Sequence, residues 1–307
     1  MPANKGVCMR VGIIGVGHVG VSVAISLLLA GGMRELLLHD RDTARAEGEA
    51  MDLAHGAPYY PRAAVRAASL DEVLDSDLIV FAAGRNSRSG ETRLQLLADN
   101  ARVATDVGRR LVGSSALLVV VSNPVDVLTR VLLQTSGLPA ERVLGTGTML
   151  DTARLHQRLG EHLGINPRSV HAQVLGEHGD SELVHWSAAQ VGGQPLRQRP
   201  GWTAADERAI GDAVRTAAHE VIQRKGMTNH AIGLVTTDLV HAVLHDEQRV
   251  LTVSRQQAGG VVLSMPAVVG RTGANQVIAP ALDAAEQAAL ARSAEVLNAA
   301  WASLPAD

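Results

Sequence analysis

Residues 7–20 read VCMRVGIIGVGHVG, an apolar run that passes directly into a turn with three glycines. The run has the composition of a buried strand, and residues 19–30 that follow it are typical of a buried helix ended by Gly31 and Gly32. Gly15, Gly17 and Gly20 form the GxGxxG pattern of a dinucleotide-binding turn. Without Cβ atoms the backbone can approach a pyrophosphate, to which the helix N-terminus presents N–H groups and partial positive charge.

A carboxylate follows at the spacing that this pattern requires. Asp40 lies 20 residues after Gly20, directly beyond a second apolar run, so it can hydrogen-bond a ribose hydroxyl. A 2′-phosphate would meet a like charge there, which favours NAD over NADP, although the neighbouring Arg41 is the usual partner of such a phosphate. We therefore expect an NAD site; a tight strand–helix turn without a ligand is the alternative.

Further short apolar runs alternate with segments of helical period up to about residue 147. Near-continuous apolar strands separated by helices predict a parallel sheet covered on both faces, and right-handed crossovers favour the doubly wound Rossmann arrangement. Longer helical stretches and two short β-like runs follow. The fold class is α/β, with residues 1–147 as a dinucleotide-binding Rossmann domain and residues 148–307 as an α+β substrate-binding, catalytic domain, and with a ligand cleft between them. The expected strands are residues 7–14, 36–38, 78–83, 116–121, 143–145, 250–254 and 260–263, and the expected helices are 19–30, 43–54, 150–163, 204–225 and 283–300.

Composition narrows the class of partner. The net charge of −3 provides no basic footprint, and 2% aromatic residues leave little to stack on bases, so nucleic acid is not an expected partner. The single cysteine, Cys8, cannot form an internal disulfide, and no apolar run near the N-terminus is long enough for a signal peptide or a membrane span. A cytoplasmic protein that binds a small molecule, not a membrane, is expected.

Five further segments carry a resemblance. They read DRDTARAEGEAMDLAHG (40–56), GETR (90–93), SNPVD (122–126), GTGTMLDTAR (145–154) and GEHGDSE (176–182). In this order they resemble the L-lactate/L-malate dehydrogenase family, most of all its bacterial L-lactate dehydrogenases. The resemblance implies reversible hydride transfer between NADH and the carbonyl carbon of a 2-oxo acid, giving an L-2-hydroxy acid, with no metal ion.

The resemblance also implies roles for three residues. His178 is similar to the family's catalytic histidine, which exchanges a proton with the substrate oxygen, a task that suits a group titrating near neutrality. Asp151 is similar to the carboxylate that orients this histidine; a helix N-cap is the alternative or an additional role. Arg154, three residues later on the same helix face, is similar to the anchor of the substrate carboxylate, which a guanidinium can hold through two parallel bonds.

Four other residues match family positions with less support from their own chemistry. Arg93 resembles a loop arginine that polarises the carbonyl when a lid containing residues 84–91 closes. Asn123 resembles a residue near the carbonyl oxygen and the nicotinamide, and Asn100 one near the nicotinamide. Thr228 resembles a threonine that lines the substrate pocket. For the last three residues an ordinary capping or turn role is the alternative.

Substrate choice depends on a loop position that Ser87 occupies in AGRNSRSGETR (residues 83–93). In the family, lactate enzymes usually have Gln there and malate enzymes Arg, which pairs with the second carboxylate of oxaloacetate. Ser87 is small and neutral, whereas Arg88 is adjacent and Arg85 is near. Pyruvate/L-lactate is therefore the leading substrate pair; a dianionic acid that uses Arg88 and a bulkier 2-oxo acid are alternatives.

The sequence leaves alternatives for regulation by an effector, for the oligomeric state and for the functional class of the protein. His171 matches one member of the family's basic pair for a sugar bisphosphate, but the other position is His156 instead of arginine, so activation by such an effector is not assumed. A homodimer or homotetramer is implied, packing on the helix that contains residues 50–55. A non-catalytic NAD-binding regulatory protein is the competing class. An NAD-using glycosidase lacks support because Cys8 is wrongly placed for its metal site.

Overall fold

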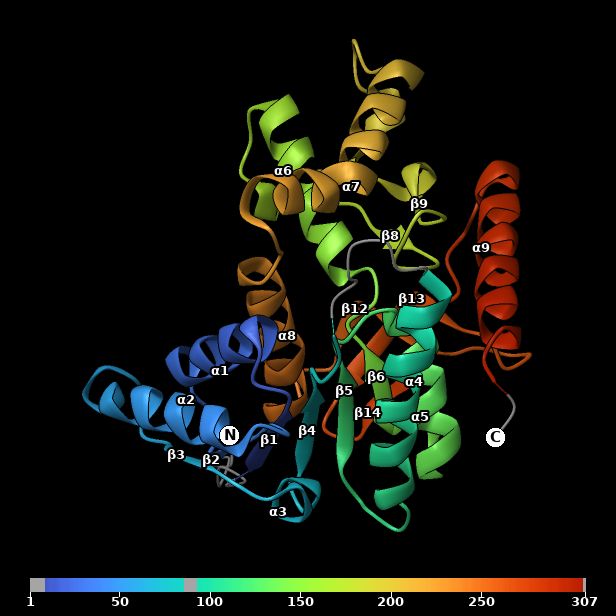
Figure 1. Ribbon diagram of the computed structural model, residues 1–307. Helices are drawn as coiled ribbons and strands as arrows, with labels where there is room; N and C mark the ends of the chain where they lie inside the picture. Colours follow the sequence, from blue (N-terminus) through green and yellow to red (C-terminus); the bar gives the residue numbers. More distant parts are fainter. Residues whose placement is uncertain (1–8, 86–92, 306–307) are drawn as a thin grey trace.

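The computed structural model describes residues 9–85 and 93–305, without the side chains of residues 93 and 94. Its first half is a parallel sheet in the spatial order β3-β2-β1-β4-β5-β6 (Figure 1). The strands are β1 (Arg10–Ile14), β2 (Glu35–His39), β3 (Ala64–Ala67), β4 (Leu78–Phe81), β5 (Leu117–Val120) and β6 (Val143–Gly145). Every residue of β4 and β5 is buried, as expected of central parallel strands that have helices on both faces. The predicted Rossmann arrangement is confirmed.

Helices cover both faces of this sheet. The helices that precede or separate its strands are α1 (His18–Ala30), α2 (Thr43–His55), α3 (Leu70–Leu74), α4 (Arg93–Arg110) and α5 (Val125–Ser136). One hydrophobic core joins α1 and α2 to the sheet, and a second core on the opposite face joins α3, α4 and α5. Gly31, with φ of 76°, ends α1 as the sequence predicts.

The second half of the chain extends the same sheet. Its antiparallel strands are β12 (Arg249–Gln256), β13 (Val262–Gly270) and β14 (Gly273–Val277), and β12 joins β6 where Ser254 faces Gly145. The two short β-like runs of the sequence are therefore real strands, longer than predicted. They continue the Rossmann sheet into a nine-stranded one.

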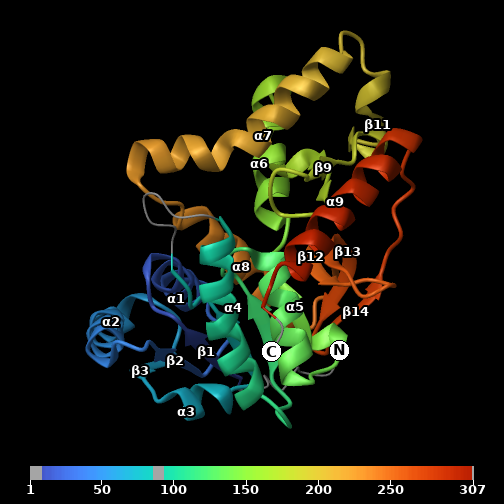
Figure 2. The same cartoon turned by 45° about the vertical axis from the view of Figure 1, so that its right-hand side comes forward.

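Of the remaining elements, α6, α7 and the short strands between them stand above one end of the sheet (Figures 1 and 2). The helices are α6 (Met149–Leu163), α7 (Ala204–Lys225), α8 (His230–Leu244) and α9 (Ala284–Ala302). The short strands are β7 (Val170–His171), β8 (Val174–Leu175), β9 (Leu183–Val184), β10 (Gln190–Val191) and β11 (Gln194–Pro195). Single turns of 3₁₀-helix are η1 (Ala57–Tyr59), η2 (Ala140–Arg142), η3 (Pro167–Ser169), η4 (Trp186–Ala188) and η5 (Leu196–Gln198).

Helix α8 packs against the Rossmann half, because its buried residues Leu239, Val240 and Val243 share the hydrophobic core of α1.

Capping boxes determine where α7 and α9 begin: Thr203 pairs with Asp206, and Asp283 pairs with Glu286. Among the helices of residues 9–85 and 93–305, none is long and apolar enough to cross a membrane.

Candidate active site

The glycine turn between β1 and α1 is built for close backbone contacts. Gly15 has φ of 95°, and a Cβ on it would lie 2.6 Å from the Cα of Ala83. A Cβ on Gly20 would lie 2.0 Å from the carbonyl oxygen of Gly15. At Gly17, the N-cap of α1, a Cβ would have no other described atom within 4 Å, so this position faces open space. Such a cradle at a helix N-terminus fits a pyrophosphate.

Asp40 follows β2 and turns its carboxylate toward this turn. One oxygen accepts a hydrogen bond from the N–H of Val16 at 3.0 Å, and the other accepts one from the N–H of Asp42 at 3.0 Å. A carboxylate has about four acceptor sites, so capacity remains for a ribose hydroxyl. The structure thus brings Asp40 and the glycine turn together, as their spacing predicts.

Asn100 and Asn123 also meet, at the carboxyl ends of β4 and β5. Asn100 is 2% exposed. Its Oδ1 accepts from the N–H of Arg85 at 3.0 Å, and its Nδ2 donates to the carbonyl oxygen of Asn123 at 2.9 Å. The Asn100 side chain therefore ties two loops together. Contact of either residue with a nicotinamide stays a prediction.

His178 and Asp151 form a buried pair although they are 27 residues apart. The Nδ1 atom of His178 lies 2.5 Å from Oδ2 of Asp151, whose Oδ1 accepts from Nη1 of Arg154 at 2.7 Å. Asp151 and Arg154 lie in α6, whereas His178 lies in the loop between β8 and β9. One carboxylate therefore holds both the imidazole and the guanidinium.

The alternative role of Asp151 as an N-cap is wrong. Helix α6 begins at Met149 with Thr148 as its N-cap, so Asp151 is inside the first turn. Its side chain is 2% exposed and is directed to His178 and Arg154 instead of to backbone N–H groups.

Asp126 is a site residue that the sequence reasoning missed. It is 2% exposed in the first turn of α5. Its Oδ2 accepts from the backbone N–H of His178 at 2.8 Å, and its Oδ1 accepts from the hydroxyl of Ser254 at 2.5 Å. Asp126 thereby fixes the loop of His178 against the Rossmann half. Its place at the end of SNPVD, beside Asn123, was the available signal.

The three acidic and basic partners decide the charge of His178. Burial disfavours the imidazolium, but the charge and hydrogen bond of Asp151, with a smaller contribution from Asp126, raise the pKa of His178 to about 9. Burial would raise the pKa of Asp151, but His178 and Arg154 lower it below its ordinary value. At neutral pH the pair is an imidazolium and a carboxylate. Because Nδ1 is bonded to Asp151, Nε2 is the nitrogen available to exchange a proton with a ligand.

Burial raises the pKa of Asp126 to about 6, while its bonds to Ser254 and to the backbone of His178 limit the rise. Above that pH the second carboxylate adds to the field that stabilises the imidazolium. The site is therefore arranged to keep a proton on His178 until a ligand accepts it.

Several predicted positions lie outside this geometry. Ser87 and Arg88 fall outside the described residues. Arg93 begins α4, and its side chain is outside the description. Thr228 is half-buried in the turn between α7 and α8, and its place beside a substrate stays a prediction. Arg85 does not supply an uncommitted positive charge, because it pairs with Asp99 at 2.6 Å.

His156 and His171 both line one surface pocket of about 620 Å³. His156 bonds through Nε2 to the carbonyl oxygen of Ala172 at 2.8 Å, and burial together with the nearby His171 lowers the pKa of His156. A neutral His156 is a weak partner for a phosphate.

Two family models match this chain. Residues 9–145 match the family model of the lactate/malate dehydrogenase NAD-binding domain, and residues 148–304 match that of the lactate/malate dehydrogenase alpha/beta C-terminal domain. The L-lactate dehydrogenase of Synechococcus sp. is 44% identical over 94% of this chain and 97% of its own length. That of Thermus aquaticus is 42% identical over 96% and 99%.

A solved structure, the minor L-lactate dehydrogenase of Enterococcus mundtii in a ligand-bound form, superimposes with a TM-score of 0.94. It is 37% identical, and the match covers 97% of this chain and 99% of that one. Both halves of the fold, the glycine turn and the His178–Asp151–Arg154 cluster lie within these matches. The chain belongs to the lactate/malate dehydrogenase family.

Proposed function

We propose that this protein is an NAD-dependent L-2-hydroxyacid dehydrogenase that interconverts pyruvate and L-lactate. The observation that carries the proposal is the single carboxylate of Asp151 that holds both His178 and Arg154, at 2.5 Å and 2.7 Å. A proton donor and a carboxylate anchor are thereby fixed side by side. That pair of functions is what reduction of a 2-oxo acid requires.

In this proposal the residues divide the work. The guanidinium of Arg154 has donors beyond the one bonded to Asp151, and it binds the substrate carboxylate. Bound NADH supplies the hydride to the carbonyl carbon. The imidazolium of His178 gives its Nε2 proton to the carbonyl oxygen, so the product is the neutral hydroxyl and the ring is left uncharged. In the reverse direction the neutral ring takes the hydroxyl proton, and Asp151 stabilises the imidazolium that forms.

The other predicted residues have supporting roles. Gly15, Gly17 and Gly20 hold the pyrophosphate, and Asp40 holds the ribose. Asn123 and Asn100 lie near the nicotinamide, Arg93 polarises the carbonyl, and Thr228 lines the pocket. Residues 1–147 serve as the dinucleotide-binding domain and residues 148–307 as the catalytic domain.

Two observations favour pyruvate over a dianionic acid. Arg85 is held by Asp99, which leaves one fewer positive charge for a second carboxylate. Ser87 at the specificity position is small and neutral, so an unpaired carboxylate there would be costly to bury. The relatives named above are L-lactate dehydrogenases, which agrees with this choice.

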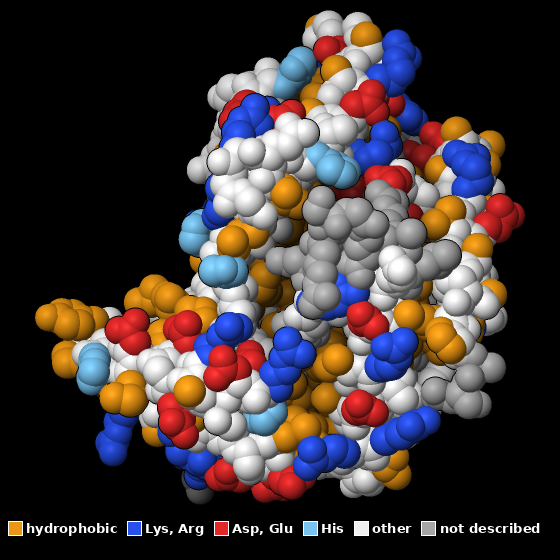
Figure 3. Space-filling model, in the orientation of Figure 1, with side chains coloured by type: hydrophobic (Ala, Val, Ile, Leu, Met, Phe, Trp, Pro, Cys, Tyr) orange, Lys and Arg blue, Asp and Glu red, His pale blue; other side chains and the backbone are white. Residues whose placement is uncertain are grey.

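A homo-oligomer, dimer or tetramer, is the proposed assembly. Large apolar side chains on α1, α2 and α8 are exposed, among them Ile25 (45%), Met51 (62%) and Leu234 (65%). In the space-filling view apolar side chains gather at the left-hand edge, over the end of α2 (Figure 3). Covering such side chains with a second copy would remove apolar surface from water. The cytoplasm is the proposed location.

A rate panel tests the activity. Pyruvate, oxaloacetate and a branched 2-oxo acid are each varied with NADH and with NADPH, and oxidation of the coenzyme is followed by absorbance. We expect the highest kcat/KM with pyruvate and NADH. Saturation by oxaloacetate at low concentration together with poor turnover of pyruvate would overturn the substrate. No turnover of any 2-oxo acid, with normal NADH binding, would favour the regulatory class.

A further inference from the structure

Glu182 ends the GEHGDSE segment and is a buried carboxyl with no role in the steps above. It is 6% exposed, and its Oε1 has no hydrogen-bond donor within reach among the described residues. A carboxylate oxygen of Glu182, a ring nitrogen of His178 and a carboxylate oxygen of Asp151 all lie within 4.8 Å of one another. Glu182 is therefore a third ionisable group beside the catalytic pair.

The charged groups that face Glu182 come from three elements. Helix α6 contributes Asp151 and Arg154, the loop of Glu182 itself contributes His178, and α7 contributes Arg215. Three of these groups are positive and one, Asp151, is negative, but none of them donates a hydrogen bond to Oε1 of Glu182 that would offset its burial.

Behind Glu182 lies a surface pocket of about 520 Å³ between its loop, α7 and α9. The pocket adds the charged side chains of Asp180, Glu286 and Arg292 to its lining. Its position gives Glu182 a side that water can reach.

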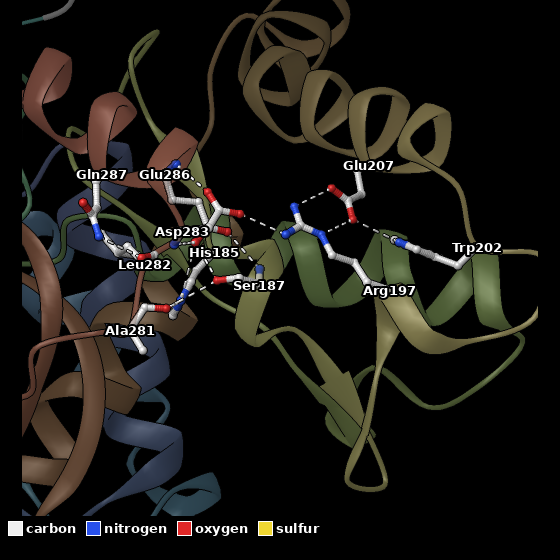
Figure 4. Close-up of polar contacts among 10 residues, drawn as sticks. All are labelled: His185, Ser187, Arg197, Trp202, Glu207, Ala281, Leu282, Asp283, Glu286 and Gln287. Carbon is white, nitrogen blue, oxygen red and sulfur yellow. Dashed lines mark hydrogen bonds and ion pairs between the residues drawn. The ribbon is translucent and has the colours of Figure 1, made fainter.

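Figure 4 shows how one wall of this pocket is fixed. Arg197 donates to Glu207 at 2.9 Å and to Asp283 at 3.0 Å. Glu286 accepts from the backbone N–H of Ser187 at 2.8 Å and from its hydroxyl at 2.5 Å. These acidic side chains are bonded within the wall, and none of the bonds involves Glu182.

Burying an ionised carboxylate that lacks a donor is costly, whereas a neutral carboxyl needs only one acceptor and brings no charge. We propose that Glu182 belongs to the catalytic cluster as a third ionisable group, which is largely protonated at neutral pH, and that its ionised fraction takes up a proton when a substrate monoanion binds beside it. The balance is simple: an ionised Glu182 carboxylate and one proton from water in the pocket give the neutral carboxyl. No bond of the substrate is involved in this step.

Two further points agree with a protonated Glu182. Burial, reinforced by Asp151 and opposed by His178, Arg215 and Arg154, raises the pKa of Glu182 to about 8. An ionised Glu182 would also place a second negative charge, next to that of Asp151, within 4.8 Å of a ring nitrogen of His178. Its protonation therefore keeps the site attractive to an anion.

The inference rests on the proposed function, and proton uptake on binding of oxamate tests both separately. Oxamate has an amino group where pyruvate has its methyl group, so its carbonyl is an unreactive amide and it binds without being reduced. Calorimetry of oxamate binding to the enzyme–NADH complex, in two buffers that differ in ionisation enthalpy, gives the number of protons taken up. At about pH 8 we expect the wild-type protein to take up about half a proton more than E182Q, because roughly half of Glu182 is then ionised in the free site. E295Q, which removes an exposed carboxylate on α9, is the matched control and should behave as wild type.

Equal proton uptake by the wild type and E182Q would overturn the inference about Glu182. Failure of oxamate to bind the wild-type enzyme–NADH complex would instead overturn the proposed function.

A second measurement needs no variant and so does not depend on the folding of E182Q. An infrared titration of the wild-type protein follows the carbonyl stretch of protonated carboxyl groups. We expect a band that is present at neutral pH and disappears as the pH rises through about 8. Asp126, whose pKa is about 6, would lose its band earlier. Absence of any protonated carboxyl above neutral pH would overturn the inference.

Discussion

Replacing Asp151 by asparagine is expected to remove the proton from His178 under conditions where the wild-type protein keeps it. The charge and hydrogen bond of Asp151 are what offset burial and raise the pKa of His178 from 6.5 to about 9. Without them, burial remains and pushes the pKa toward or below its ordinary value. The amide of asparagine preserves the size of the side chain, so the change acts mainly on charge.

The magnitude follows from the two pKa values. A pKa of about 9 corresponds to about 3 kcal/mol of differential stabilisation of the imidazolium. At about pH 8 the protonated fraction falls from roughly 0.9 to roughly 0.03, so a ligand that requires the imidazolium loses about 30-fold in affinity. The direction of the pH dependence follows from the same pKa. The rate of pyruvate reduction by the wild type should decline as the pH rises through about 9, whereas the rate of lactate oxidation should increase over the same range.

The assay is the dissociation constant of oxamate from the enzyme–NADH complex across a range of pH, read from NADH fluorescence. In D151N the pH at which oxamate affinity is lost should move down by at least about 2.5, with NADH affinity unchanged. Glu161→Gln is the matched control, because Glu161 forms an exposed pair with Arg158 at the same three-residue spacing on the same helix. An unchanged midpoint in D151N would refute the reasoning that Asp151 sets the charge of His178.

Four further substitutions are expected to separate anchoring of the substrate, binding of the cofactor and polarisation of the carbonyl. Arg154→Lys keeps the positive charge but loses the two parallel hydrogen bonds to the substrate carboxylate, so KM for pyruvate should rise roughly 10–100-fold. An unchanged KM in steady-state kinetics would contradict the role of Arg154 as the carboxylate anchor. Gly17→Ala should leave the melting temperature of the free protein unchanged, because φ of Gly17 is −72° and the space beyond it is open. The same substitution should weaken the binding of NADH at least about tenfold, as measured by titration calorimetry. By contrast Gly20→Ala should lower the melting temperature itself, because its Cβ would lie 2.0 Å from the oxygen of Gly15; the reverse ranking of the two variants would not fit this geometry. Arg93→Gln should lower kcat by two to three orders of magnitude, about 3–4 kcal/mol, with an unchanged circular dichroism spectrum; near-normal turnover would remove Arg93 from the mechanism.

The sequence predicts the local parts of the site well. The glycine turn, Asp40 and the Asp151–Arg154 spacing depend on residues that are close along the chain, where helix and strand periods determine which side chains meet. The turn is as close-packed as GxGxxG implies, and Arg154 bonds to Asp151 as the three-residue spacing on one helix predicts.

Long-range features were beyond that reasoning. No pattern in the sequence pairs β12 with β6, because the contact of Ser254 with Gly145 joins segments more than a hundred residues apart. Asp126 and Glu182 were not singled out for a related reason. A carboxyl near a motif is usually solvated, and only the packed structure reveals that both are buried beside His178. The pairing of Arg85 with Asp99 depends likewise on the fold of its loop.

The most direct test of the account is a crystal structure of the protein with NADH and oxamate bound together. We expect the oxamate carboxylate to accept two parallel hydrogen bonds from Arg154, and the oxamate carbonyl oxygen to lie about 3 Å from Nε2 of His178. Oxamate bound elsewhere, with Arg154 and His178 not contacting it in the NADH complex, would contradict the account.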